Sequence, residues 1–176
     1  MRFIKDGKPA IDRWTRVADD APLPDGVPVL LPAARFLAEA PACGARAAPV
    51  GVLWPNNRDI AELAPHLAGV TAVALNFPSF RDGRAYSQAR LLRERYRYRG
   101  ELRATGQVLR DQFLFMLRAG FDAFEVVKDG DADAFPEVVR RYTRYYQPSV
   151  DRRPVIAGAR LVRDHILAGA PVRAVS

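Results

Sequence analysis

The sequence predicts an α/β protein with a mostly parallel, open sheet of about five strands and flanking helices. Between residues 50 and 146, short apolar runs alternate with segments of helical periodicity. The runs are apolar at consecutive positions, which is typical of strands in a parallel sheet that helices cover. Such alternation indicates βαβ units. About five strands are too few for a closed eight-stranded barrel, so we expect a Rossmann-like sheet or a partial barrel.

The chain length indicates one domain with one hydrophobic core, since 176 residues lie within the usual size of a domain. Residues 1–26 are polar and contain Pro and Gly, so we interpret them as an N-terminal arm. We assign the α/β domain to residues 27–148 and a C-terminal extension to residues 149–176. Within that extension, residues 155–167 have a pattern compatible with a helix.

The strands are predicted from apolar runs that end at turn-forming residues. The run at 27–31 ends at Pro32, and the run at 50–54 is followed by Pro55-Asn56-Asn57. The same reasoning gives five expected strands, at 27–31, 50–54, 70–77, 101–104 and 123–127.

The helices are predicted from apolar residues at helical spacing and from their end signals. Asn57 is the expected N-cap of a helix, Gly120 a C-cap, and Pro136 opens a last helix that Pro148 stops. That last helix would carry Tyr142, Tyr145 and Tyr146 as a core-facing stripe; the alternative is a basic and aromatic surface for nucleic acid. The expected helical ranges are 33–39, 58–68, 85–97, 107–118 and 136–146, and residues 41–49 are expected to form a loop.

Positive charge is concentrated in the centre of the chain. The formal net charge is +7, and residues 81–110 contain nine Arg against Asp82, Glu94 and Glu101. A local excess of positive charge attracts small anions, nucleic acid or an acidic protein surface. The sequence therefore predicts an anion- or partner-binding site within this segment.

Ligands of open α/β sheets bind outside the carboxyl ends of the strands, which selects three loops here. One of these loops carries aromatic residues and arginines and leads into a helix. The free N–H groups at the start of that helix, together with Arg81 and Arg84, would bind a carboxylate, a phosphate or a sulfur oxyanion. The candidate ligand-binding residues are Asn56, Arg81, Arg84, Tyr86, Ser87, Arg103, Thr105, Gly106 and Arg110.

Each of these candidates also has a purely structural explanation. Arg84 and Asp82 could pair around a turn, and Gly106 could simply relieve one. Arg103 shares a strand face with Glu101, so an ion pair is as good an explanation as a ligand contact.

The sequence does not contain the motifs typical of several kinds of cofactor, metal or catalytic site. No dinucleotide-binding or phosphate-binding glycine motif is present, so the sequence identifies no cofactor. His66, His165 and Cys43 are too scattered to predict a metal site or a nucleophile–base pair. A single Cys, no secretory signal and no membrane-spanning apolar run predict a cytoplasmic protein.

Three ordered stretches resemble DUF934, a bacterial family of unknown function. They are Phe80–Arg93, Gly100–Gln112 and Gly120–Phe124; the Trp54–Asn57 and Tyr145–Pro148 segments fit as well, and the resemblance extends over about residues 25–148. Gln107 stands where many relatives are expected to have an acidic residue, which argues against acid–base chemistry at that position.

The resemblance implies a role in assimilatory sulfite reduction, with which members of this family are associated. We expect an accessory or oxidoreductase-associated protein whose partner is sulfite reductase or another enzyme of sulfate assimilation. One alternative is an independent oxidoreductase with an unrecognised flavin or nicotinamide site. A second alternative, a nucleic-acid-binding protein, explains the basic character of the chain but little else.

Overall fold

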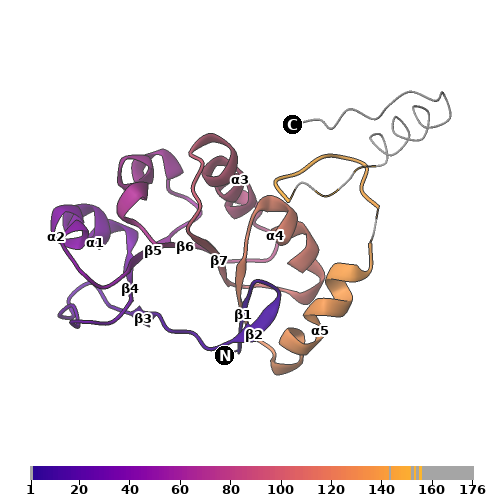
Figure 1. Ribbon diagram of the computed structural model, residues 1–176, viewed down its shortest axis with the longest axis horizontal. Helices are drawn as coiled ribbons and strands as arrows, with labels where there is room; N and C mark the ends of the chain where they lie inside the picture. Colours follow the sequence, from indigo (N-terminus) through magenta and orange to yellow (C-terminus); the bar gives the residue numbers. More distant parts are fainter. Residues whose placement is uncertain (1, 143, 152, 154, 156–176) are drawn as a thin grey trace, which may run out of the picture.

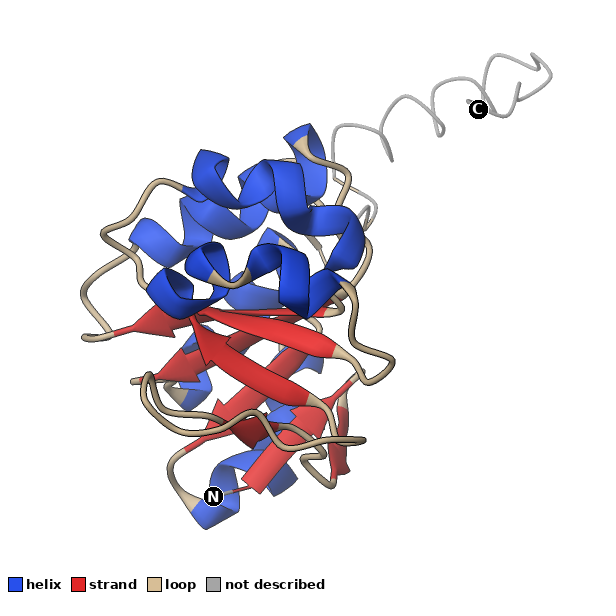
Figure 2. Ribbon diagram, turned by 90° about the vertical axis from the view of Figure 1, so that its left-hand side faces the viewer, coloured by secondary structure: helices blue, strands red, loops and turns tan. Residues whose placement is uncertain are grey.

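The protein is an α/β structure built on a curled, mixed, eight-stranded sheet (Figures 1 and 2). The computed structural model describes residues 2–142, 144–151, 153 and 155. The spatial order of the strands is β2-β1-β8-β7-β6-β5-β4-β3. The strands are β1 (Arg2–Lys5), β2 (Lys8–Ala10), β3 (Thr15–Arg16), β4 (Val29–Pro32), β5 (Val50–Trp54), β6 (Ala72–Phe77), β7 (Glu101–Gly106) and β8 (Ala123–Val126).

The α/β class is confirmed, but the prediction of a mostly parallel sheet of about five strands is wrong. The five expected strands correspond to β4 through β8, which pair in parallel. Residues 2–16, within the segment interpreted as an arm, add three more strands, and β1 is antiparallel to both β2 and β8. β2 and β3 could not be predicted from apolar runs, because their residues are exposed.

The helices lie along the outer, convex side of the sheet (Figure 1). The strands β4 to β8 are neighbours in the sheet in the order of the chain. The helices that connect them therefore lie next to one another. The α-helices are α1 (Ala33–Ala38), α2 (Ala40–Gly44), α3 (Arg84–Arg90), α4 (Phe113–Ala119) and α5 (Asp129–Arg140). Two 3₁₀ helices, η1 (Ile60–Gly69) and η3 (Arg110–Gln112), and a π-helical turn, η2 (Leu91–Arg95), complete the layer.

Several helix boundaries differ from the predictions. The N-cap of η1 is Asp59, whose carboxylate accepts a hydrogen bond from the Ala61 N–H, and not Asn57. Residues expected to form a loop contain α2, and α5 begins before Pro136 and ends at Arg140. Gly120 is confirmed as a C-cap, with φ of +104°. The expected helix at 155–167 lies outside the described residues, except for Val155.

The hydrophobic core lies between the convex face of the sheet and the helices. Alternate residues of β4 to β8, such as Val52, Leu75 and Phe124, point into this core. The concave face carries a smaller apolar group, in which Leu30 packs with Ala72 and Ala74 under Trp14 and Leu53.

The curl of the sheet follows from the short chain segment that joins its two edges. β2 and β3 are at opposite edges, seven strand-to-strand steps apart, which in a flat sheet would be about 34 Å. The segment from Ala10 to Thr15 can extend over at most about 18 Å. The edges must therefore approach each other, and residues 11–14, here called the bridging segment, cross the concave side.

Candidate functional site

The structure divides the predicted site residues among three places. Asn56, Arg81, Arg84 and Ser87 lie on or beside the loops at the carboxyl ends of β5 and β6. Arg103, Thr105 and Gly106 lie on β7, and Tyr86 and Arg110 line the outer helical layer. The nine arginines of residues 81–110 therefore do not form one face.

Arg84 is paired with a carboxylate of its own loop. Its Nε and Nη2 atoms donate to the two carboxylate oxygens of Asp82, at 3.0 and 2.6 Å. Hydrogen bonds from Arg84, and the nearby Asn56 amide, hold the pKa of Asp82 well below its usual range. The pairing around a turn that the sequence left open is thus present in the structure.

The loop that carries Arg81 is held by two glutamines. Gln107 accepts from the Phe80 N–H at 3.3 Å, and Gln112 donates to the Phe80 carbonyl at 3.0 Å. The Arg81 guanidinium lies over the Phe80 ring, and Ser87 is exposed on α3. Gln107 and Gln112 therefore position this loop.

Arg103 is completely buried on the concave face of the sheet. Its guanidinium donates to both carboxylate oxygens of Asp12, at 2.8 and 2.9 Å, and to Glu101 and Glu125. It also lies 4.2 Å from the centre of the Phe3 ring. Burial disfavours the charged form, but the surrounding carboxylates outweigh this effect and raise the pKa of Arg103.

Thr105 belongs to the same cluster. Its hydroxyl donates to Glu125 at 2.6 Å and accepts from Arg16, which also pairs with Glu125. Lys5 adds a second cation beside Glu101, at 3.3 Å. We call Lys5, Asp12, Arg16, Glu101, Arg103, Thr105 and Glu125 the inner network. Its three cations face three carboxylates, so it has no excess positive charge to offer an anion.

Gly106 makes the tight turn at the end of β7. Its φ is +90°, and a Cβ atom there would lie 2.4 Å from the Phe77 carbonyl oxygen. Only glycine fits such a position without strain.

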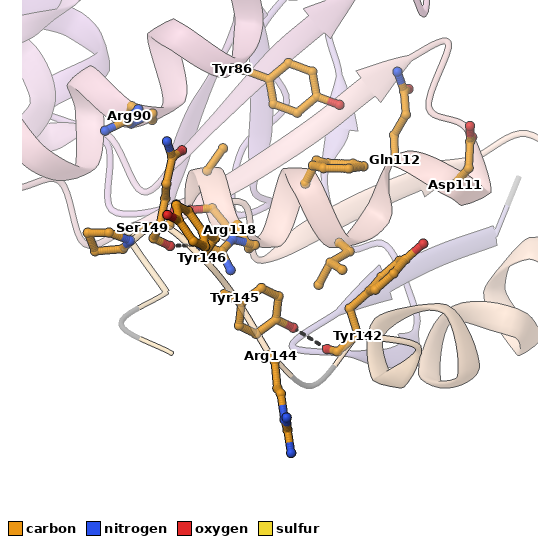
Figure 3. A pocket seen from close by; sticks show the side chains of 15 residues that line it. Tyr86, Arg90, Asp111, Gln112, Arg118, Tyr142, Arg144, Tyr145, Tyr146 and Ser149 are labelled. Atoms are coloured by element: carbon orange, nitrogen blue, oxygen red, sulfur yellow. Dashed lines mark hydrogen bonds between the residues drawn. The ribbon is translucent and has the colours of Figure 1, made fainter. Parts of the chain in front are cut away.

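Tyr86 lines a groove of about 960 Å³ between α3, α4 and the segment that follows α5 (Figure 3). Burial, and secondarily the charge of Asp111, raises the pKa of Tyr86 to about 12, so its hydroxyl stays protonated at neutral pH. The lining residues are Tyr86, Arg90, Asp111, Gln112, Leu114, Phe115, Arg118, Ala119, Tyr142, Arg144, Tyr145, Tyr146, Gln147, Pro148 and Ser149.

The far wall of the groove consists of Tyr142 and residues 144–149, and this wall is attached to α4. Arg118 donates to the Gln147 carbonyl at 2.5 Å, and Ser149 donates to the Arg118 carbonyl at 2.6 Å. The Arg118 guanidinium stacks 4.0 Å from the centre of the Tyr145 ring. Figure 3 shows Tyr86 and Gln112 on one side of the groove and Tyr142 and Tyr145 on the other.

The groove continues into a second lobe of about 570 Å³. The two lobes share Asp111, Leu114, Phe115 and Tyr142, and the second lobe adds Val138 and the predicted residue Arg110. Arg110 lies 3.8 Å from Glu137 there. The five arginines of the two lobes are Arg90, Arg110, Arg118, Arg141 and Arg144, and the one lining carboxylate is Asp111.

Of the groove residues, sequence reasoning selected Tyr86 and Arg110 as site candidates, and it gave a basic and aromatic surface only as the alternative for Tyr142, Tyr145 and Tyr146. The expected core-facing stripe is wrong for Tyr142 and Tyr146, whose residues are 58% and 83% exposed, because α5 ends at Arg140. Phe115 is 64% exposed although it lies within an apolar helix. The mixture of Tyr and Arg in residues 140–146 was the sequence feature that could have indicated the groove.

Within the described ranges, no three His, Cys, Asp or Glu residues come together as metal ligands would. No helix in those ranges is both long enough and apolar enough to cross a membrane.

The structure thus defines an α/β protein with a curled mixed sheet and a basic, aromatic groove on its helical side. A family model described as "Bacterial protein of unknown function (DUF934)" matches residues 51–156, which is more than half of the chain, and the chain therefore belongs to that family. Comparisons with curated proteins and with solved structures gave no match.

Proposed function

We propose that this protein is an accessory component of assimilatory sulfite reduction, which binds an anionic partner through the groove and does not carry the redox chemistry itself. The pathway is the one that the resemblance to this family implies. The binding role is supported by the groove, whose lining includes five arginines, several aromatic side chains and one carboxylate. Two of these arginines, Arg90 and Arg110, also pair at the surface with Glu94 and Glu137, at 3.2 and 3.8 Å. Such a surface favours an anionic occupant.

The groove supports the proposal better than do Arg84 and Arg103, two candidates predicted from the sequence. Arg103 and Arg84 are each neutralised by carboxylates within the chain. Among the described residues, no carboxylate pairs with Arg141 or Arg144, and both are exposed, so their charge can act on a ligand in the groove.

The test is co-purification from the native bacterium grown on sulfate as the sole sulfur source. We expect tagged protein to recover sulfite reductase or a related sulfur-pathway enzyme. The substitution Arg90→Glu in the groove should abolish most of this recovery, because it reverses the charge of an exposed wall residue.

The matched control is Arg99→Glu, which makes the same change of charge at an exposed position outside the groove. Recovery should survive in this variant. Absence of any sulfur-pathway enzyme would refute the assigned pathway, and equal loss in both variants would refute the assigned surface.

A further inference from the structure

The shape of the groove restricts the class of its occupant. The site is an open trough of two connected lobes, of about 960 and about 570 Å³. Binding sites for small molecules are closed enough to bury most of the ligand surface. Here Phe115, Tyr142 and Tyr146 are more than half exposed, which favours a long occupant lying across the surface.

The composition of the groove matches that of a protein-binding surface. Tyr and Arg are the side chains most enriched at the energetic centres of protein interfaces, together with Trp. The groove places both types together with Leu114 and Phe115, which supply apolar contacts between the charges. An occupant therefore needs carboxylates for the arginines and apolar side chains for the surface between them.

Two polar atoms of the groove wall indicate whether a peptide or a simple anion suits the site better. In the described part of the chain, Nη1 of Arg118 and Oε1 of Gln112 are covered and have no hydrogen-bond partner. One is a donor and the other an acceptor. A fully deprotonated anion such as sulfate offers acceptors only, whereas a peptide backbone offers both N–H and C=O groups. Because both atoms are covered in the free chain, neighbouring side chains must shift before an occupant reaches them.

We infer that the groove binds an extended, acidic segment of a partner protein, in which aromatic or aliphatic side chains alternate with carboxylates. The inference rests on the proposed function only in using the same groove; it does not depend on the pathway. The arginines would pair with the carboxylates of the segment, and its apolar side chains would pack on Phe115 and Tyr142 in the two lobes.

The test uses the full chain and synthetic peptides labelled with a fluorophore, with binding followed by anisotropy. The main probe alternates Glu with Phe and Leu; a second peptide of equal length contains only Glu and Gly. We expect the first peptide to bind, the second to bind at least several-fold more weakly, and added salt to weaken both. Arg90→Glu and Phe115→Ser should each weaken the first peptide by roughly tenfold, as loss of a strong interface contact does.

Matched controls keep this test independent of folding and of total charge. Arg99→Glu repeats the change of charge, and Ile11→Ser repeats the loss of an exposed apolar side chain, both outside the groove. Both controls should bind the first peptide like the wild type. Circular dichroism verifies that all four variants remain folded.

Three results would overturn the inference. One is no binding of the alternating peptide, and another is equal effects of groove and control substitutions. The third is tighter, groove-dependent binding of ATP, inorganic phosphate or a single-stranded oligonucleotide. Because these probes contain no sulfur-pathway protein, the inference can fail while co-purification succeeds, and the reverse is equally distinguishable.

Discussion

Arg103 shows how a single buried cation can be mistaken for a ligand-binding residue. The sequence placed it beside Glu101 on one strand face, and that ion pair is confirmed. Its other partners, Asp12 and Glu125, lie 91 and 22 residues away in the chain. Sequence spacing predicts neighbours within one strand, but it does not show which distant carboxylates a curled sheet brings to the same point.

Removal of Arg103 should destabilise the fold strongly. In an Arg103→Ala variant, Asp12, Glu101 and Glu125 would lose the cation at the centre of the inner network. Breaking a buried ion pair by removing one partner typically costs about 3–5 kcal/mol. Urea unfolding followed by circular dichroism measures this loss of unfolding free energy. Arg99→Ala, at an exposed position, is the control; similar midpoints for both variants would contradict the role assigned to Arg103.

At the scale of elements, the bridging segment turns a long sheet into a nearly closed one. Asp12 anchors it to β7 through two hydrogen bonds to Arg103, and Trp14 covers the small residues Ala72 and Ala74. Backbone pairing of β3 with β4 involves only two residues, Thr15 and Arg16, so the side-chain contacts carry much of the attachment.

We therefore expect Asp12→Asn to loosen the bridging segment without unfolding the protein. The neutral amide loses the charge-assisted bonds to Arg103, which are stronger than bonds between neutral groups. Trypsin cleavage after the exposed Arg13 should become faster in a time course analysed by mass spectrometry. Asp19→Asn, at an exposed position, is the matched control. An unchanged cleavage rate for Asp12→Asn would show that the anchor lies elsewhere.

The end of α5 shows a second limit of sequence patterns at this scale. The spacing of Tyr142, Tyr145 and Tyr146 fits a helix, but the helix ends at Arg140. Tyr145 instead stacks on Arg118 and donates its hydroxyl proton to the Tyr142 carbonyl at 2.6 Å. These tertiary contacts, which helical periodicity does not include, create the wall of the groove.

At the scale of the whole molecule, stability should differ between the sheet and the groove wall. β5, β6 and β7 are paired on both edges and buried. Residues 144–149 are attached to α4 mainly by side-chain bonds from Arg118 and Ser149. Amide hydrogens in segments with few such contacts exchange by local opening, whereas core strands require global unfolding.

Hydrogen–deuterium exchange with mass spectrometry tests this difference. We expect peptides from β5 to β7 to be the slowest to exchange and a peptide covering residues 144–149 to exchange much faster. The alternating acidic peptide should slow exchange in that segment when it occupies the groove. Equal protection of the sheet and the groove wall in the free protein would contradict a weakly attached wall.

The sequence by itself determined the α/β class, the five central strands and the concentration of positive charge. Each of these depends on residues close together in the chain, through apolar runs, turn residues and local composition. The tertiary structure alone decided that β1 to β3 join the sheet, that Arg103 is neutralised and that a groove forms beside α4. These features depend on contacts between distant segments: the short link between the sheet edges forces the curl, and the curl brings Asp12 to Arg103.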